Sequence, residues 1–283
     1  MITPEEEAYI LEKAYVPEHI VSLMALISKG DPFLVEDHLG LVKDNWLILV
    51  GYPLDQRFSI ERSEKVIKHV LETFRSEILW FIGPEIPASL LNTCQERETD
   101  QYYRLDLQKV KVKASLKRAV DKASQELTIE RAHSISKEHE ALISELLKRE
   151  KLPPRVRELY RAMPYYVAHS SSACVLNARD KNGELAAFFV VELGAKNFST
   201  YVLGSHSKKH YVPHASDLLF FEMIELTREH GKDIIHLGLG VNKGIRRFKE
   251  KWGGVPFLNY EFCEHRPRST KIASVIRILE GKL

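Results

Sequence analysis

The sequence predicts an α/β (α+β) protein in two parts, each with a mixed central sheet flanked by helices, on three observations. Apolar runs of strand length alternate along the chain with segments whose apolar residues recur at helical spacing. The first half orders them as strand, helix and strand, and its run at 77–84 is apolar enough for a buried strand. In the second half, three strand-like segments precede a long helix and a further strand, as in a mixed sheet with one helical crossover.

The elements of the first half follow from local signals. A helix is expected from Pro17, which suits a first helical position, to Gly30. Two or three short strands rich in Val, Leu and aromatic residues are expected over 33–53. A second helix over 63–74 precedes the apolar strand at 77–84, and a strand over 102–107 leads to the boundary between the two parts.

The second half opens with a basic helix over 108–125 and a strand over 127–132, followed by helices over 137–150 and 154–163. Three strands are expected over 174–207, and the Asn-Gly pair at 182–183 suits a tight turn between the first two. Ser216 is expected to cap the next helix. The remaining elements are a strand at 233–240, a short basic helix within 242–254, a strand at 255–265 and an amphipathic helix at 269–281.

The helix between 216 and 231 connects two strands of one sheet. Such crossovers are right-handed and join parallel strands, so the segments Thr200–Gly204 and Asp233–Leu237 are expected to be parallel neighbours.

Composition excludes several classes of protein. The chain of 283 residues is 44% hydrophobic and 28% charged, the balance of a folded globular protein. It has no apolar run of the ~18 residues that a membrane helix needs, and its N-terminus is acidic where a secretion signal would be basic. Its three distant cysteines form no CxxC and no evident disulfide framework. We therefore expect a cytoplasmic protein without stable membrane insertion; the oligomeric state stays open.

Charge is divided unevenly along the chain. Residues 1–110 carry eight more acidic than basic side chains, and residues 111–283 carry ten more basic than acidic ones. This asymmetry suggests that the second half faces an anion, such as a coenzyme pyrophosphate, a nucleic-acid backbone or a phosphorylated acceptor. The alternative is ordinary solvated surface charge.

Three stretches of the second half resemble the bacterial-type FemAB-like aminoacyltransferases, which carry two GNAT-like domains in tandem. The stretch KASLKRAVDKASQELTIERA is similar to the helix and strand that open their second domain, and HYVPHASDLLFFEMIELTREHGKDIIHLGLGV to their loop, long helix and strand. The stretch NKGIRRFKEKWGG is similar to the family's Gly-x-x-x-Phe-Lys-x-x-aromatic-Gly ending. The resemblance implies a degenerate GNAT-like domain at 1–110 and a GNAT-like transferase domain at 111–283.

One departure bears on the donor. Acetyl-CoA-dependent members of the GNAT group hold the coenzyme pyrophosphate in a Gly-rich turn at a helix N-terminus. Here no glycine occurs between Gly204 and Gly231. The resemblance therefore favours an aminoacyl-tRNA donor, with an acyl-CoA as the alternative and no tightly bound cofactor or metal.

The function so implied is transfer of an acyl or aminoacyl group to an amine, on a small molecule or a cell-wall precursor, with tRNA as a candidate partner. The alternatives are an acetyl-CoA-dependent N-acetyltransferase with an atypical pyrophosphate loop and a GNAT-fold binding protein without catalysis. Transfer needs a deprotonated nucleophile, a stabilised oxyanion and a proton route. Lys249 is the expected oxyanion-stabilising cation. The surrounding residues expected to bind substrate are Gly238, Gly240, Asn242, Lys243, Gly244, Arg246 and Phe248.

Candidates outside this stretch each have a structural alternative. His210 could act as acid or base, and Tyr211 could hydrogen-bond substrate or only pack its ring. Glu192 could be a base or bind the acceptor, although a lone charge in a strand usually faces water. Lys117 and Arg118 could bind phosphates or lie on a solvated helix face. His206, His210 and His214 have a metal-like spacing, but Pro213 breaks any helix that would align them.

Overall fold

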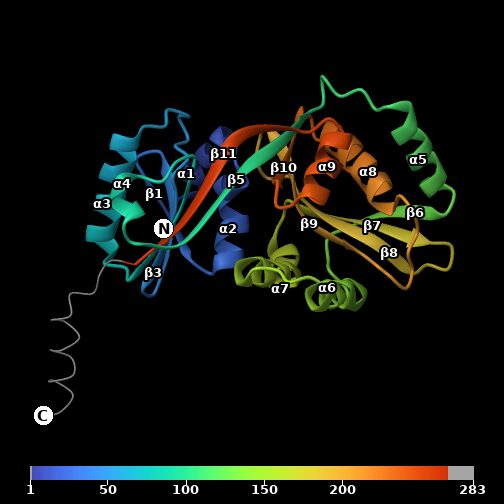
Figure 1. The fold of residues 1–283 in the computed structure, drawn as a ribbon, viewed down its shortest axis with the longest axis horizontal. Helices are drawn as coiled ribbons and strands as arrows, with labels where there is room; N and C mark the ends of the chain where they lie inside the picture. The colour runs from blue at the N-terminus through green and yellow to red at the C-terminus, as the bar shows by residue number, and fades with distance from the viewer. Residues whose placement is uncertain (1, 267–283) are drawn as a thin grey trace, which may run out of the picture. The chain divides into compact units, whose positions relative to one another are not determined.

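The computed structural model describes residues 2–266, which form two compact units. Unit 1 consists of residues 2–30 and 100–258, and unit 2 of residues 31–99 and 259–266. Each unit has a mixed sheet with helices against it, so the predicted fold class is confirmed (Figure 1). The helix predicted at 269–281 lies outside the described residues.

The sheet of unit 1 has the strand order β5-β10-β9-β8-β7-β6. It includes a long meander in which neighbouring strands run antiparallel. As predicted, β9 and β10 are parallel, with Ile234–His236 paired to Phe198–Thr200. The bounds are Cys94–Asp106 for β5, Leu127–Ala132 for β6, Ala173–Asp180 for β7, Leu185–Glu192 for β8, Phe198–His206 for β9 and Ile234–Leu239 for β10.

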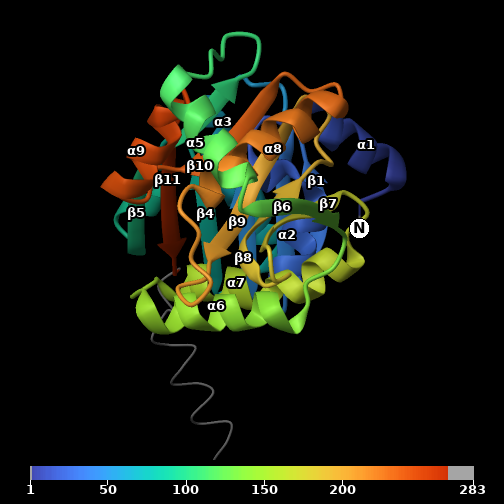
Figure 2. The same ribbon diagram turned by 90° about the vertical axis from the view of Figure 1, so that its right-hand side faces the viewer.

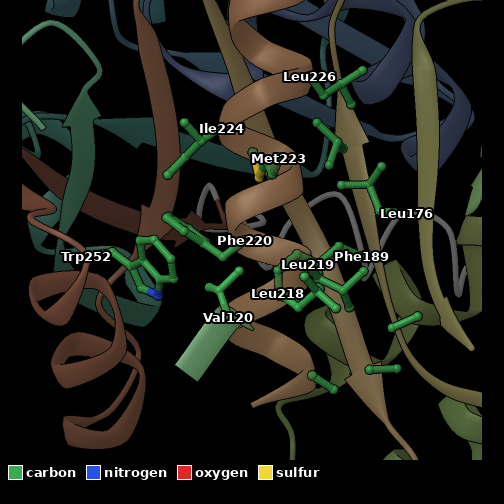
Figure 3. Close-up of a cluster of buried hydrophobic side chains, with 14 of the residues drawn as sticks. Val120, Leu176, Phe189, Leu218, Leu219, Phe220, Met223, Ile224, Leu226 and Trp252 are labelled. Carbon is green, nitrogen blue, oxygen red and sulfur yellow. The ribbon is translucent and has the colours of Figure 1, made fainter. Parts of the chain in front are cut away.

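Helices cover both faces of the unit 1 sheet (Figures 1 and 2). One face carries α5 (Ala114–Ser124), α8 (Ala215–Glu229) and α9 (Lys243–Lys251), and a core of α8 side chains fills the space beneath them (Figure 3). The other face carries α6 (Lys137–Arg149) and α7 (Pro154–His169). Because β8 is buried along its whole length, its sequence is almost continuously apolar rather than alternating.

The N-terminal residues belong to unit 1. Helix α1 (Pro4–Lys13) begins at a capping box formed by Thr3 and Glu6, a signal that the sequence analysis did not use. The helix predicted from Pro17 is divided at Ile20, whose extended backbone separates a 3₁₀ turn (Pro17–His19) from α2 (Val21–Ser28). Helix α2 packs against α7, and Leu23 lies in the same core as residues of β7 and β8.

Unit 2 is a smaller mixed sheet. Its strands β1 (Asp31–Val35), β2 (His38–Lys43) and β3 (Trp46–Val50) are antiparallel, and β4 (Ile78–Gly83) is parallel to β3. The later part of β11 (Val255–His265) pairs with β4. Helix α3 (Ile60–Phe74), predicted over 63–74, packs Val66, Ile67 and Val70 into the core against this sheet. Helix α4 (Ala88–Leu91) is a single turn.

The cysteine prediction is wrong in part. Cys94 of β5 and Cys263 of β11 are joined by a disulfide bond, with their Cα atoms 5.6 Å apart. The two residues are 169 positions apart, so only the pairing of distant strands brings them together. Cys174 remains a free, buried thiol. The expectation of a cytoplasmic protein depended in part on unpaired cysteines and loses that support.

The division of the chain differs from the predicted domains 1–110 and 111–283. Residues 2–30 pack with the later unit, and residues 259–266 with the earlier one. Helix amphipathicity shows that a helix has a buried face but not which sheet it covers. Two local details also differ. Helix α8 begins at Ala215 after His214, so Ser216 is not its cap, and α7 continues through Pro164 to His169.

Among residues 2–266, the structure contains no helix with the length and apolar composition required to cross a bilayer.

A buried carboxylate links α8 to the end of α9. Asp217 Oδ1 accepts hydrogen bonds from Lys251 Nζ (2.5 Å) and from the indole of Trp252 (3.0 Å). The Trp252 ring packs against Phe220 of α8, with ring centroids 4.9 Å apart (Figure 3). Because Asp217 and Trp252 are both buried, neither group can exchange its partner for water at low cost.

We expect Asp217→Ala to lower the free energy of unfolding by about 2 kcal/mol, because it leaves the Trp252 indole N–H buried without an acceptor. The double variant with Trp252→Phe removes both partners and should show a clear coupling energy in a double-mutant cycle measured by denaturant unfolding. Arg228→Ala, at an exposed α8 position, serves as the control. Strictly additive losses would contradict the role of this link.

Candidate active site

The pairing of β9 with β10 ends early. The register stops at Thr200 and His236, while β9 continues to His206 and β10 to Leu239. On its other side, β10 has a bulge between His236 and Gly238 in its pairing with β5, and Gly238 has a φ of 69°, which favours glycine. The two parallel strands therefore separate at one end of the sheet.

A cavity of about 240 Å³ lies at this separation; we call it the α8–α9 cavity. Its walls come from β8, β9, β10 and the first two turns of α8 and α9. The lining residues are Phe189, Tyr201, Gly204, Ser205, His206, Ser216, Phe220, Leu237, Gly244, Ile245, Phe248 and Lys249. All of them belong to unit 1. The cavity thus combines a mainly apolar wall with a few polar groups, as ligand sites commonly do.

Gly204 allows β9 to pass close to its neighbour at the cavity wall. A Cβ at this position would lie 2.6 Å from the Phe189 ring and 2.7 Å from the Phe188 carbonyl oxygen. Any larger residue would therefore displace the aromatic wall or the strand. The Tyr160 hydroxyl of α7 donates to the Gly204 carbonyl (3.2 Å), which fixes the backbone from the opposite face.

Lys249 is the single ammonium group among the lining residues. Its side chain is 6% exposed, its Nζ donates to the Leu239 carbonyl oxygen, and it lies 5.6 Å from the centre of the Tyr103 ring. Burial lowers the pKa of this ammonium to about 7, against the opposing attraction of Asp100. It therefore changes its charge near neutral pH, unlike an ordinary surface lysine.

The backbone before α9 is fixed by Asp100 and Asn242. Asp100 Oδ2 accepts from the Val241 N–H (2.7 Å), and its Oδ1 lies 3.5 Å from the Arg246 guanidinium. The Asn242 side chain caps the helix by accepting from the Ile245 N–H (3.0 Å). These contacts determine where α9 begins, and its helical spacing then directs Ile245, Phe248 and Lys249 to the cavity.

His236 of β10 lies close enough to Lys249 to be affected by its charge. It is fully buried, its Nδ1 accepts from the Gly238 N–H (3.2 Å), and its Nε2 has no hydrogen-bond partner among the described residues. Burial, followed by the charge of Lys249, lowers the pKa of His236 to about 3. The imidazole is therefore neutral at physiological pH and adds no second positive charge near Lys249.

Only some of the residues predicted to bind substrate within 238–249 line the α8–α9 cavity. Lys249, Gly244 and Phe248 line the α8–α9 cavity. Gly238 forms the bulge, the Gly240 N–H donates to the Gln101 carbonyl (3.1 Å), and Asn242 and Arg246 make the contacts described above. Lys243 is exposed at the first position of α9 and does not line the cavity.

The other predicted residues lie away from the cavity. Glu192 is fully buried, where it accepts from the Tyr166 hydroxyl and from the Gly194 N–H (2.6 Å). His210 lies 3.8 Å from Asp180 and 3.7 Å from Glu184. Tyr211 is 62% exposed, and Lys117 and Arg118 are exposed on α5. These five residues are not brought together with Lys249 at the cavity wall.

The three histidines of the 206–214 loop have separate surroundings. His206 lines the α8–α9 cavity, His210 faces the β7–β8 turn, and His214 Nδ1 lies 3.2 Å from Asp217. Burial lowers the pKa of His206, as does the positive charge of Arg149. Of the three, His206 is thus the one placed to exchange a proton within the cavity.

Sequence reasoning missed most of the aromatic wall. Phe189, Tyr201 and Phe220 lie in apolar segments that look like ordinary core, and Ser216 was interpreted as a helix cap. The sequence feature that could have located the cavity is Lys249 itself. It follows Ile245 by four residues and Phe248 by one, so a charged residue shares the side of the helix that carries its two apolar residues.

By sequence, no family model matches the chain and no curated protein matches it. Solved structures with the same fold include tandem GNAT proteins. One is the tandem GNAT protein from the clavulanic acid biosynthesis pathway, with a TM-score of 0.53 and 14% identity over 81% of this chain and 78% of that one.

Two further structures are similar over almost the whole chain. L-PGS from Bacillus licheniformis has a TM-score of 0.60 and 16% identity, covering 96% of this chain and 95% of that one. FemX has a TM-score of 0.63 and 10% identity, covering 92% and 96%. At these identities the likeness establishes the fold, and at that level the resemblance to FemAB-like and tandem GNAT proteins is confirmed.

The buried ammonium of Lys249 generates a pH-dependent prediction. Its folded pKa of about 7 is below the ordinary value of 10.5, so burial of the charge destabilises the fold fully below pH 7. As the pH rises from 7 to 10.5, the folded protein loses this proton while the unfolded chain keeps it, and the penalty fades. We therefore expect Lys249→Met to increase the free energy of unfolding near neutral pH, with a smaller gain at about pH 10.

Denaturant unfolding at about pH 6 and about pH 10 measures this difference. Arg247→Met, which removes an exposed cation of the same helix, is the matched control and should give no gain that fades with pH. Equal effects of Lys249→Met at both pH values would show that the ammonium is not destabilised by burial.

Proposed function

We propose that the chain is an acyl- or aminoacyl-transferase in which the activated acyl group of the donor lies in the α8–α9 cavity beside Lys249. The observation that carries this proposal is the position of a buried lysine at the point where two parallel strands separate. A cation in a water-poor cavity stabilises developing negative charge more strongly than one in water.

The residues present suit a direct transfer. The acceptor amine attacks the acyl carbonyl carbon, a C–N bond forms, and the C–O bond of an ester donor, or the C–S bond of a thioester, breaks. The amine proton passes to the leaving oxygen or sulfur. Lys249 uses one N–H on the Leu239 carbonyl, and the remaining N–H groups of the ammonium can donate to the carbonyl oxygen as it becomes an oxyanion.

His206 is the candidate proton carrier at the cavity wall. It lines the cavity, and its lowered pKa keeps the ring neutral and able to accept a proton at physiological pH. This assignment moves the acid–base role from His210 to another histidine of the same loop.

The loop before α8 favours an ester donor such as aminoacyl-tRNA over acetyl-CoA. It contains no glycine, and some of its backbone N–H groups already have partners. Ser207 N–H donates to the Ala186 carbonyl (2.8 Å), and His210 N–H donates to Ser207 Oγ (2.9 Å). A pyrophosphate cradle needs free, converging N–H groups. Structures of the same fold include the C-terminal domain of a putative lysylphosphatidylglycerol synthetase from Agrobacterium fabrum.

The proposal is tested by incubating the full chain with either aminoacyl-tRNA or acyl-CoA donors and a panel of amine acceptors, and by measuring transfer to the amine. Consumption of aminoacyl-tRNA is the expected result. Acetyl-CoA as the sole donor would instead support the N-acetyltransferase alternative. Failure of every donor to react would favour a binding protein without catalysis.

Lys249→Met should lower kcat/KM by about 100-fold or more, because it removes the cation that stabilises the oxyanion. Lys249→Arg keeps a charge and should retain part of the rate. Arg247→Met, on the exposed side of α9, is expected to keep the wild-type rate. An unchanged rate in Lys249→Met would remove this residue from the mechanism.

The pH dependence supplies a separate prediction. Lys249 must be protonated to act, so the rate should decline as the pH rises through about 7. In Lys249→Arg this decline should disappear, because the guanidinium stays charged throughout. A pH–rate profile of kcat/KM for both proteins measures it, and an identical decline in the variant would assign the titration to another group.

A further inference from the structure

The α8–α9 cavity is too large for a small acyl group. An apolar protein cavity of about 150 Å³ accommodates a benzene ring, and this cavity measures about 240 Å³. An acetyl or alanyl methyl group would leave most of that space without contacts. Since uncontacted apolar walls forgo dispersion and hydrophobic stabilisation, a larger apolar group would bind more favourably.

The aromatic wall is held open by its own packing. Phe220 meets Phe248 edge to face, with ring centroids 5.5 Å apart and an interplanar angle of 87°. Phe189 meets Tyr201 in the same manner, at 4.9 Å and 78°. Both arrangements are favourable geometries for aromatic pairs. The cavity is therefore bounded by side chains that already have partners, rather than by side chains that would collapse into an empty space.

The lining also discriminates by charge. No aspartate or glutamate occurs among its lining residues within the described part of the chain. The nearby carboxylate of Asp100 is engaged by the Val241 and Gln101 N–H groups, both at 2.7 Å. A cationic acyl side chain would be buried without an anionic partner and would share the cavity with Lys249, so its binding would be disfavoured.

We propose that the α8–α9 cavity selects donors whose acyl group is bulky, apolar and uncharged, of the size of a leucyl, methionyl or phenylalanyl side chain. The inference rests on the proposed function, because it assigns the donor's acyl group to this cavity. It goes further by excluding lysyl donors on charge and acetyl or alanyl donors on size.

Methionyl and lysyl donors form a matched pair, because their side chains are similar in length and differ in charge. With one tRNA charged in turn with methionine, phenylalanine, alanine or lysine, kcat/KM for the methionyl and phenylalanyl forms should exceed that for the other two by about 10-fold or more. Preference for the lysyl or alanyl form would overturn the inference while leaving transferase activity established.

A binding measurement separates this inference from the proposed function. N-acetyl-methioninamide and N-acetyl-phenylalaninamide should bind the full chain and perturb the NMR signals of the Phe189 and Phe220 rings, whereas N-acetyl-lysinamide should not. This result is expected whether or not any donor is turned over. Absence of binding by all three probes, or equal binding by the lysine probe, would overturn the selectivity.

A variant that reduces the space gives a third readout. Ser216 lies in the first turn of α8, is half-buried and lines the cavity, so Ser216→Phe should occupy part of it without disturbing the core. It should weaken binding of N-acetyl-phenylalaninamide about 10-fold or more. Arg228→Phe, which adds the same ring at an exposed position of α8, should leave that affinity unchanged. Equal affinities in both variants would place the probe outside the cavity.

Discussion

The early end of the pairing between β9 and β10 is the constraint on which the rest of unit 1 depends. Two parallel strands that stay in register would leave no opening in the sheet. Here they hold together over three residue pairs and then separate, with a bulge at Gly238 turning the end of β10. The helices that follow each strand, α8 and α9, therefore begin at this opening, and their first two turns form part of its wall.

That opening explains why a lysine is tolerated at the buried position 249 of α9. A buried ammonium is unfavourable unless it is hydrogen-bonded or can release its proton. Lys249 has both possibilities, since the Leu239 carbonyl accepts from it and its lowered pKa permits neutralisation near pH 7. A site that the fold stabilises poorly in this way is often a functional one, because the unfavourable charge is retained for what it does to a ligand.

The helices and strands could be predicted well from the sequence, but the way they assemble into two units could not. The strand at 127–132, the meander over 174–207 and the parallel pair of β9 and β10 depended on local apolar patterns and the handedness of crossovers, and they are confirmed. The placement of residues 2–30 in unit 1 and the pairing of Cys94 with Cys263 depended on contacts between distant segments. At the candidate site, Lys249 was recognisable from its motif. The aromatic wall was not, because Phe189 and Phe220 have the same local pattern as other core residues.

The exchange of terminal segments between the units has a consequence for biosynthesis. The helices at residues 4–28 are made before the rest of their core, which contains residues of β7, β8 and α7 that are made more than 100 residues later. Unit 2 likewise lacks one strand until residues 259–265 are synthesised. Neither unit can therefore complete its core until the later segment has been made, and the apolar faces of the helices at residues 4–28 lack their partners until residues 154–192 are synthesised.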